Sequence, residues 1–210
     1  MGPISMGGFG SGRGFSGNAM EREKGIKKNF SYDDCAAIWI RQSQREGRAG
    51  QGRMFFWGPV IYSYRPNWPL ARIVYGKGNV AFVLVNNDNA SITTSSHLGC
   101  VRHAIRLFMG EGHSVFNLNR DAVANWRDVG DDSRESVYAF YANHFESSME
   151  GACKKRIRQT TRDRFLADCQ SYANEANRFA AAFGDPMQFP RNQSEALAMM
   201  LAYQPERMAA

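Results

Sequence analysis

The sequence predicts an α+β fold, with a small antiparallel sheet packed against a helix and a mostly helical C-terminal half that contains one long helix. Between residues 54 and 93, short apolar and aromatic runs alternate with turn residues, which is typical of a strand meander. Beyond residue 97, apolar residues recur every three or four positions, which is typical of helices. At 210 residues and 43% hydrophobic composition, the chain should form one main domain.

We expect three regions along the chain: an arm over residues 1–28, an α+β domain over 29–112 and a helical region over 113–210. The arm is rich in Gly, Ser and Arg and has too little apolar periodicity to pack. Its Gly-Arg-Gly-Phe run at 12–15 is similar to segments that contact RNA through Arg and Phe stacking. A plain tail or linker is the alternative that its composition favours.

The first predicted helix follows Ser31, which is an N-cap candidate because Asp34 stands three residues later. The apolar residues at 36–40 form its core, and we expect it to stop at Gly47. Residues 47–52 are rich in Gly and Arg and are expected to form a loop.

Strands are predicted where β-branched and aromatic residues gather between turn residues. They cover residues 54–57, 60–64, 70–75, 80–86 and 91–93. A helix should follow, because apolar side chains from Leu98 to Phe108 keep helical spacing and end before Gly110. This helix can cover one face of the sheet.

The C-terminal half is predicted to be helical. We expect a short helix around residues 122–126 and longer ones over 133–150 and 152–183. Gly184 and Pro186 supply the stop after the longest helix. A last helix is expected over 194–203.

A quarter of the chain carries a resemblance to a known family. Residues 60–64 contain a Ser-Tyr element, 69–73 a Pro-Leu-Ala strand, 82–86 a Val-Leu-Val-Asn strand and 93–97 a Thr-Thr-Ser-Ser-His turn, with Val101 and Ala104 following. In this order they resemble a small domain of unknown function found in phage-encoded proteins. The resemblance implies a phage or mobile-element origin and no particular activity.

Basic residues suggest a polyanionic or acidic partner for this chain of net charge +6. Six cations fall within residues 154–164, at the start of a predicted helix, where the helix dipole favours acids instead. Lys155, Arg158 and Arg162 would form one stripe beside the apolar face. The candidate binding residues of this segment are Lys154, Lys155, Arg156, Arg158 and Arg162. A solvated helix face is the alternative.

A second basic group adjoins an aromatic-rich stretch. Its arginines are Arg41, Arg45, Arg48 and Arg53, and the aromatic residues are Phe55, Phe56, Trp57, Tyr62 and Tyr64. Arginine beside exposed rings is what a platform for single-stranded nucleic acid requires, since bases stack while phosphates pair with Arg. The alternative is that these rings belong to the core.

The Thr-Thr-Ser-Ser-His segment is predicted to begin a helix, with Thr94 or Ser95 as its N-cap. Free amides at a helix start also favour an anion site, which would use Thr94, Ser95, Ser96, His97 and Arg102. A Ser-His hydrolase is disfavoured because the chain has no G-x-S-x-G motif.

We expect no catalytic residue, no metal and no cofactor. His97, Cys100 and His103 are three residues apart, so on one helix the first and third diverge by about 120° and a fourth ligand is lacking. The four cysteines are scattered and are expected to be reduced thiols. Because neither a secretory signal nor a membrane span is evident, we expect a cytoplasmic location.

These observations favour a non-enzymatic accessory protein that binds nucleic acid or a nucleoprotein complex through its basic helix and arm. The alternative is a protein-binding inhibitor of a host complex, docked on an acidic surface. The oligomeric state is left open.

Overall fold

A computed structural model describes residues 27–88, 91–109, 115–127, 132–186, 189–190, 194–195 and 198. The predicted arm over residues 1–28 lies outside this part of the chain, apart from its last two residues. Most of the helix expected over 194–203 also lies outside it.

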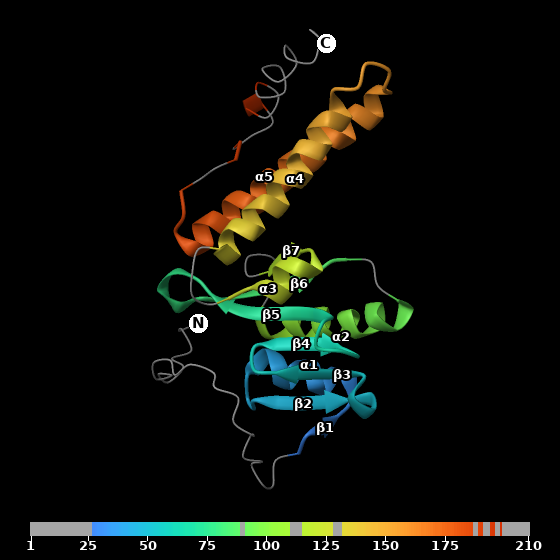
Figure 1. Cartoon of the computed structure of the whole chain (residues 1–210), viewed down its shortest axis with the longest axis vertical. Coiled ribbons are helices and arrows are strands. Elements are labelled where there is room, and N and C mark those ends of the chain that lie inside the picture. Colours follow the sequence, from blue (N-terminus) through green and yellow to red (C-terminus); the bar gives the residue numbers. More distant parts are fainter. Residues whose placement is uncertain are drawn as a thin grey trace.

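Within the described ranges, seven strands form one sheet, and their order in the sheet is their order in the chain (Figure 1). They are β1 (Asn29–Phe30), β2 (Glu46–Ala49), β3 (Met54–Trp57), β4 (Val60–Ser63), β5 (Pro69–Tyr75), β6 (Ala81–Asn86) and β7 (Val115–Leu118). The pairs β1–β2 and β6–β7 are parallel, and the four pairs between them are antiparallel. The α+β class is therefore confirmed, whereas the sheet is larger and mixed instead of small and antiparallel.

Five helices accompany the sheet in the described residues. They are α1 (Tyr32–Arg41), α2 (Ile92–Met109), α3 (Arg120–Asn125), α4 (Asp132–Ala152) and α5 (Gln159–Phe183). Ser31 caps α1 as predicted, because its Oγ accepts from the Asp34 amide at 3.1 Å. The helix ends earlier than Gly47, since Gln42 takes the left-handed conformation after it.

The segment predicted as a loop over residues 47–52 begins inside β2, which the sequence analysis missed. Gly47 is buried there, and a Cβ on it would lie 2.5 Å from Cε1 of Phe56. Glycine is needed at this point because the Phe56 ring packs directly on the strand backbone. Residues 50–52 then form a short 3₁₀ turn.

Helices cover the two faces of the sheet unequally. On one face, α1 and α2 enclose a core that includes Trp39, Ile61 and Val83. On the other, α3, α4 and α5 pack on β5, β6 and β7 around Leu84 and Phe179. The α4–α5 hairpin then extends away from the sheet beyond its β7 edge (Figure 1).

Arg178 fastens α5 to the last strand. Its guanidinium donates to the carbonyl of Val115 at 2.5 Å and lies 4.6 Å from the centre of the Phe116 ring. Because β7 pairs with β6, residues on both sides of the predicted boundary between residues 112 and 113 belong to one sheet. The region expected to be helical contributes a strand to the common sheet.

The helix predicted over residues 152–183 is interrupted near its start. α4 continues to Ala152, the chain turns over residues 153–158, and α5 begins at Gln159. A Cβ on Gly151 would lie 2.7 Å from Cε1 of Phe165, so the two helices approach closely just before the turn. The predicted stop is confirmed, since Gly184 has φ 77° and closes α5.

Candidate functional site

The face of β2, β3 and β4 that points away from α1 has no helix on it in the described residues. None of the buried side chains in the core beneath α3, α4 and α5 comes from these three strands. Alternation along β3 places Met54 and Phe56 in the opposite core and leaves Phe55 and Trp57 on this second face. This face therefore forms a sheet surface beside the helical layer, on which Trp57 is exposed, Phe55 and Tyr62 are half-buried and Val60 is buried.

Strand register brings one arginine and two aromatic rings into a row across this surface. Arg48 on β2 is opposite Phe55 on β3, and Phe55 is opposite Tyr62 on β4. The Phe55 and Tyr62 rings are stacked, with centroids 5.1 Å apart and planes 21° apart. Arg48 is exposed, and its Nε donates to Oδ1 of Asn29 at 2.7 Å.

Trp57 adds a third ring to the same face. It is 42% exposed, and the Arg45 guanidinium lies 5.7 Å from its ring centre. We call the set formed by Arg45, Arg48, Phe55, Trp57 and Tyr62 the aromatic platform. Two exposed arginines, one exposed ring and two half-buried rings therefore share one surface, which can stack bases and pair with phosphates.

Arg72 on β5 lies between the aromatic platform and α3. Its guanidinium donates to the carbonyls of Val123 and Ala124 at 3.0 and 3.2 Å, and so joins β5 to the end of α3. Burial raises the pKa of Tyr62, and the charge of Arg72 partly offsets this effect. The Tyr62 hydroxyl is consequently neutral at pH 7 and can donate a hydrogen bond.

The structure brings only part of the predicted basic and aromatic group together. Arg41 lies at the end of α1, with its guanidinium 5.0 Å from the centre of the Phe108 ring on α2. Arg53 is exposed after the 3₁₀ turn, where its charge acts on His97. Phe56 faces the core, and the Tyr64 ring lies 5.6 Å from that of His97.

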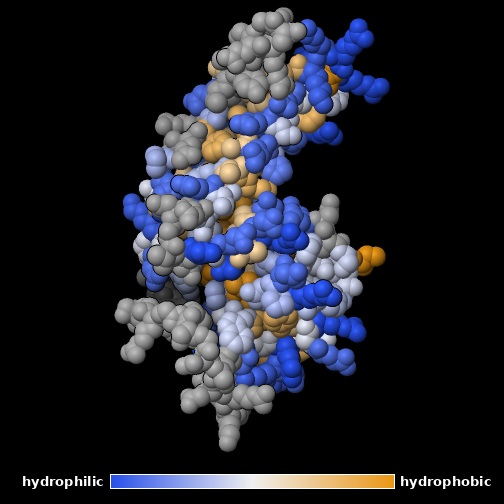
Figure 2. All heavy atoms as spheres, viewed as in Figure 1, coloured by the Kyte–Doolittle hydropathy of each residue, from blue (hydrophilic) through white to orange (hydrophobic). Residues whose placement is uncertain are grey.

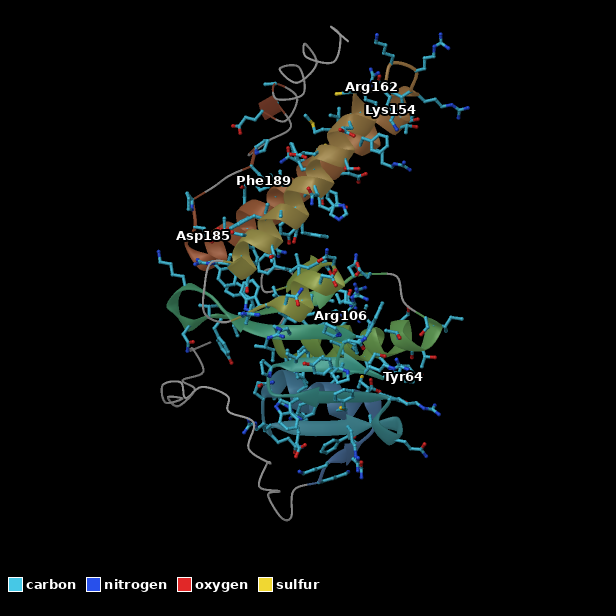
Figure 3. All side chains as sticks on the ribbon, viewed as in Figure 1. Tyr64, Arg106, Lys154, Arg162, Asp185 and Phe189 are labelled. Atoms are coloured by element: carbon cyan, nitrogen blue, oxygen red, sulfur yellow. The ribbon has the colours of Figure 1, made fainter. Side chains whose placement is uncertain are left out.

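The predicted stripe of Lys155, Arg158 and Arg162 on one helix is wrong, because residues 153–158 form the turn between α4 and α5. We call this turn the hairpin tip. Lys154, Lys155, Arg156 and Arg158 are exposed in it. Figure 2 shows hydrophilic side chains at this far end of the hairpin, and Figure 3 labels Lys154 and Arg162 there.

Arg162 closes the hairpin tip instead of facing solvent. It is half-buried, and its Nε donates to the carbonyl of Ala152 at 3.1 Å. Ala152 is the last residue of α4, so this bond satisfies one of the carbonyls that a helix end leaves without an intrahelical partner. Four of the six clustered cations therefore lie at a chain reversal, and the other two, Arg162 and Arg164, lie near the start of α5.

Of the five residues of the predicted anion site, only Thr94 and His97 are brought together, since both lie within hydrogen-bond distance of Ser63 Oγ. The helix begins earlier than expected, so Ile92 and Thr93 are helical and the strand predicted over residues 91–93 is absent. Ser91 is the capping residue, since its Oγ accepts from the Thr94 amide at 3.3 Å, and the prediction of Thr94 or Ser95 is wrong. Thr94 and His97 are buried, Ser95 and Ser96 are exposed, and Arg102 donates to Asn87 at 2.7 Å.

The partner of His97 is a serine that the sequence pattern does not indicate. Nδ1 of His97 lies 2.9 Å from Oγ of Ser63 on β4, a residue distant in the chain. Ser63 and His97 are 1% and 2% exposed, so a substrate does not reach the pair, and it serves to join α2 to the sheet. Burial, together with the charge of Arg53, lowers the pKa of His97.

The remaining candidate ligands are dispersed. His103 is exposed while His97 is buried, and the described ranges contain no group of three or more His, Cys, Asp or Glu that could hold a metal ion. Burial raises the pKa of Cys35 to about 12 and those of Cys100 and Cys169 to about 11, so these thiols are poor nucleophiles.

Comparison with known proteins gives no relative: no family model, curated protein or solved structure matches the chain. The phage origin implied by residues 60–104 therefore stays a prediction. No helix within the described ranges is long and apolar enough to cross a membrane.

Proposed function

We propose that this chain is a non-enzymatic nucleic-acid-binding protein that holds single-stranded RNA or DNA on the aromatic platform. The observation that carries the proposal is the stacked Phe55–Tyr62 pair in register with Arg48, on a sheet face without a helix over it in the described residues. Single strands offer unpaired bases to such rings, whereas a duplex keeps its bases stacked inside.

We expect base stacking on the rings to contribute most of the binding free energy. Stacking one base on an aromatic side chain contributes about 1–3 kcal/mol, and it tolerates any sequence because every base has a π face. Arg45 and Arg48 then pair with the phosphates of the same strand, and the net charge of +6 favours its approach. Exposed cations of the hairpin tip can hold a more distant part of a long strand.

The ring contribution can be tested with the double variant Phe55→Leu, Tyr62→Leu. We expect the affinity for a short fluorescently labelled single strand to fall by about tenfold or more, with a cooperative unfolding transition retained, because leucine preserves apolar contact at these half-buried positions. Tyr75→Leu is the matched control, because Tyr75 is an exposed ring at the end of β5. The proposal fails if the wild-type chain does not bind, or if the folded double variant binds as well as the wild type.

The salt dependence of binding should report the phosphate contact of Arg48. Arg48→Gln should reduce the slope of log affinity against log salt by about 0.7 if one phosphate contact of a single strand is lost. Lys77→Gln removes an exposed charge in the turn before β6 and should leave the slope unchanged. Equal slopes for both variants would show that Arg48 is not at the phosphate backbone.

The hairpin tip favours a second candidate function, docking on an acidic protein surface as an inhibitor. Lys154, Lys155 and Arg156 are exposed in a turn at the far end of the hairpin (Figure 3). Replacing all three by Ala should abolish capture of an acidic protein partner under this function. Under the platform proposal the same change should weaken long single strands and leave short ones nearly unaffected.

A further inference from the structure

A cavity of about 330 Å³ lies where β6 and β7 meet the α4–α5 hairpin. Asn87 and Asp88, which follow β6, and Asn119, which follows β7, line one side. Because β6 and β7 are parallel neighbours, their carboxyl ends open at the same sheet edge, where α/β proteins commonly bind ligands. The volume is at the lower end of the range for small-molecule sites.

The charges lining this cavity are opposite in sign to the net charge of the chain. Among the described residues that line it, the ionisable side chains are Asp88, Glu175, His144 and two tyrosines, and none is Lys or Arg. Oδ2 of Asp88 accepts from the amide of Arg120 at 2.8 Å, which leaves Oδ1 for a ligand donor. Glu175 is paired with Arg178 at 2.6 Å, so its orientation is set before any ligand arrives.

Aromatic rings form the side of the cavity contributed by the hairpin. His144 and Tyr172 are stacked, with centroids 4.9 Å apart and planes 16° apart, and the Phe140 ring lies 4.4 Å from His144. Ring faces attract cations, and the attraction grows as the cation is desolvated. Carboxylates on one side and rings on the other disfavour anions and suit organic cations.

Tyr141 supplies an independent sign of a missing polar partner. It lines the cavity and is 1% exposed, yet its hydroxyl has no hydrogen-bond partner among the described residues. A buried polar atom without a partner costs about 1–3 kcal/mol. Burial and the neighbouring charge of Glu175 raise the pKa of Tyr141, so its hydroxyl remains neutral, and its oxygen can accept a hydrogen bond from a ligand N–H group.

We propose that this cavity binds a small organic cation of the amine or guanidine class. The carboxylates of Asp88 and Glu175 accept the N–H groups of the ligand, and His144 and Tyr172 pack against its carbon chain. This site is separate from the aromatic platform and does not depend on the proposed function.

The test is isothermal titration of the full chain with putrescine, agmatine and tyramine, with glutarate as the anionic control. At least one amine should bind saturably at one site per chain, and glutarate should not. Asp88→Asn keeps an acceptor for the Arg120 amide but removes the charge, and should weaken binding by about tenfold or more. Asp163→Asn, an exposed carboxylate on α5, is the matched control and should bind as the wild type does.

Two further variants keep the proposal open to refutation. Tyr141→Phe should weaken the same amine without lowering the melting temperature of the free chain, because it removes a hydroxyl that has no partner. Phe55→Leu, Tyr62→Leu should bind the amine normally, which separates this site from the platform. Absence of saturable binding by all three amines, or equal affinities for Asp88→Asn and Asp163→Asn, would overturn the proposal.

Discussion

His97 is held between a serine and two aromatic rings. Its Nδ1 lies 2.9 Å from Oγ of Ser63, and the rings of Tyr32 and Tyr64 lie 4.7 and 5.6 Å from its own. Burial and the positive charge of Arg53 lower its pKa, so the folded protein holds this imidazole neutral at pH 7. Protonating it would place a second positive charge near Arg53 in a site that water does not reach.

Stability should therefore fall as the pH drops below about 6.5, the pKa of histidine in an unfolded chain. In that range the unfolded chain binds a proton that folded His97 does not, and the loss continues until the pH reaches the lowered folded pKa. Urea unfolding at about pH 7.5 and about pH 5.5 measures the effect.

The variant His97→Gln should flatten this pH dependence, whatever its stability at neutral pH. His103→Gln is the matched control, because His103 is exposed on the same helix, and it should behave as the wild type. If His97→Gln keeps the full pH dependence, the acid sensitivity originates elsewhere in the chain.

At the scale of elements, the α4–α5 hairpin depends on its tip as well as on its core. Phe145, Met149 and Cys169 pack between the two helices far from the sheet. Just beyond them, Arg162 donates to the carbonyls of Ala152 and Lys154 at 3.1 and 3.4 Å. These bonds fix the turn that presents the exposed cations.

Arg162→Ala should lower the free energy of unfolding by about 1–2 kcal/mol, because charged hydrogen bonds to the helix end are lost. Arg164→Ala is the matched control: Arg164 is exposed over the Phe165 ring and should change stability by less than about 0.5 kcal/mol. Denaturant unfolding measures the loss of unfolding free energy in each variant. Equal losses would show that the hydrogen bonds of Arg162 do not stabilise the turn.

Strands rich in apolar residues could be predicted, and those without such a run could not. β3 to β6 were predicted nearly to their bounds because β-branched and aromatic residues fill them between clear turns. β2 reads Glu-Gly-Arg-Ala and is a strand because Gly47 allows Phe56 to pack against it. β7 is short and belongs to the sheet because it pairs with β6. The local sequence pattern does not indicate this long-range contact.

The same limit applied to the platform. Its residue types were evident from the sequence, but the Arg48–Phe55–Tyr62 row depends on the register of β2, which was not predicted as a strand. For the Lys155–Arg158–Arg162 stripe, helical spacing was assumed through a segment where two helices meet. Spacing is informative only where the element itself is continuous.

At the scale of the whole molecule, β7 and the α4–α5 hairpin cover apolar side chains of the sheet that residues 27–112 cannot bury by themselves. The face of β5 and β6 opposite α2 buries Val74, Phe82 and Leu84 under α3, α4 and α5. In a fragment ending at residue 112 these side chains would meet water, at a cost of about 25 cal/mol for each Å² exposed.

A fragment of residues 27–112 should therefore fail to unfold cooperatively, whereas residues 27–190 should retain the full transition. Circular dichroism during urea titration tests both chains. A cooperative transition in the shorter fragment, with a similar midpoint, would support the predicted domain boundary between residues 112 and 113.

Because sheet order follows chain order, each of the strands β3 to β6 can pair with the preceding strand soon after it is synthesised. The antiparallel strands β2 to β6 are joined by short turns, so their pairing closes small loops and should be fast. β7 can pair with β6 only after α2 has formed on the sheet. The face of β5, β6 and β7 opposite α2 is covered later, when α4 and α5 pack on it. On the ribosome, the platform strands can thus pair before α3, α4 and α5 are made. The apolar face of β5 and β6 is then uncovered, so we expect the chain to be most prone to aggregation at this stage.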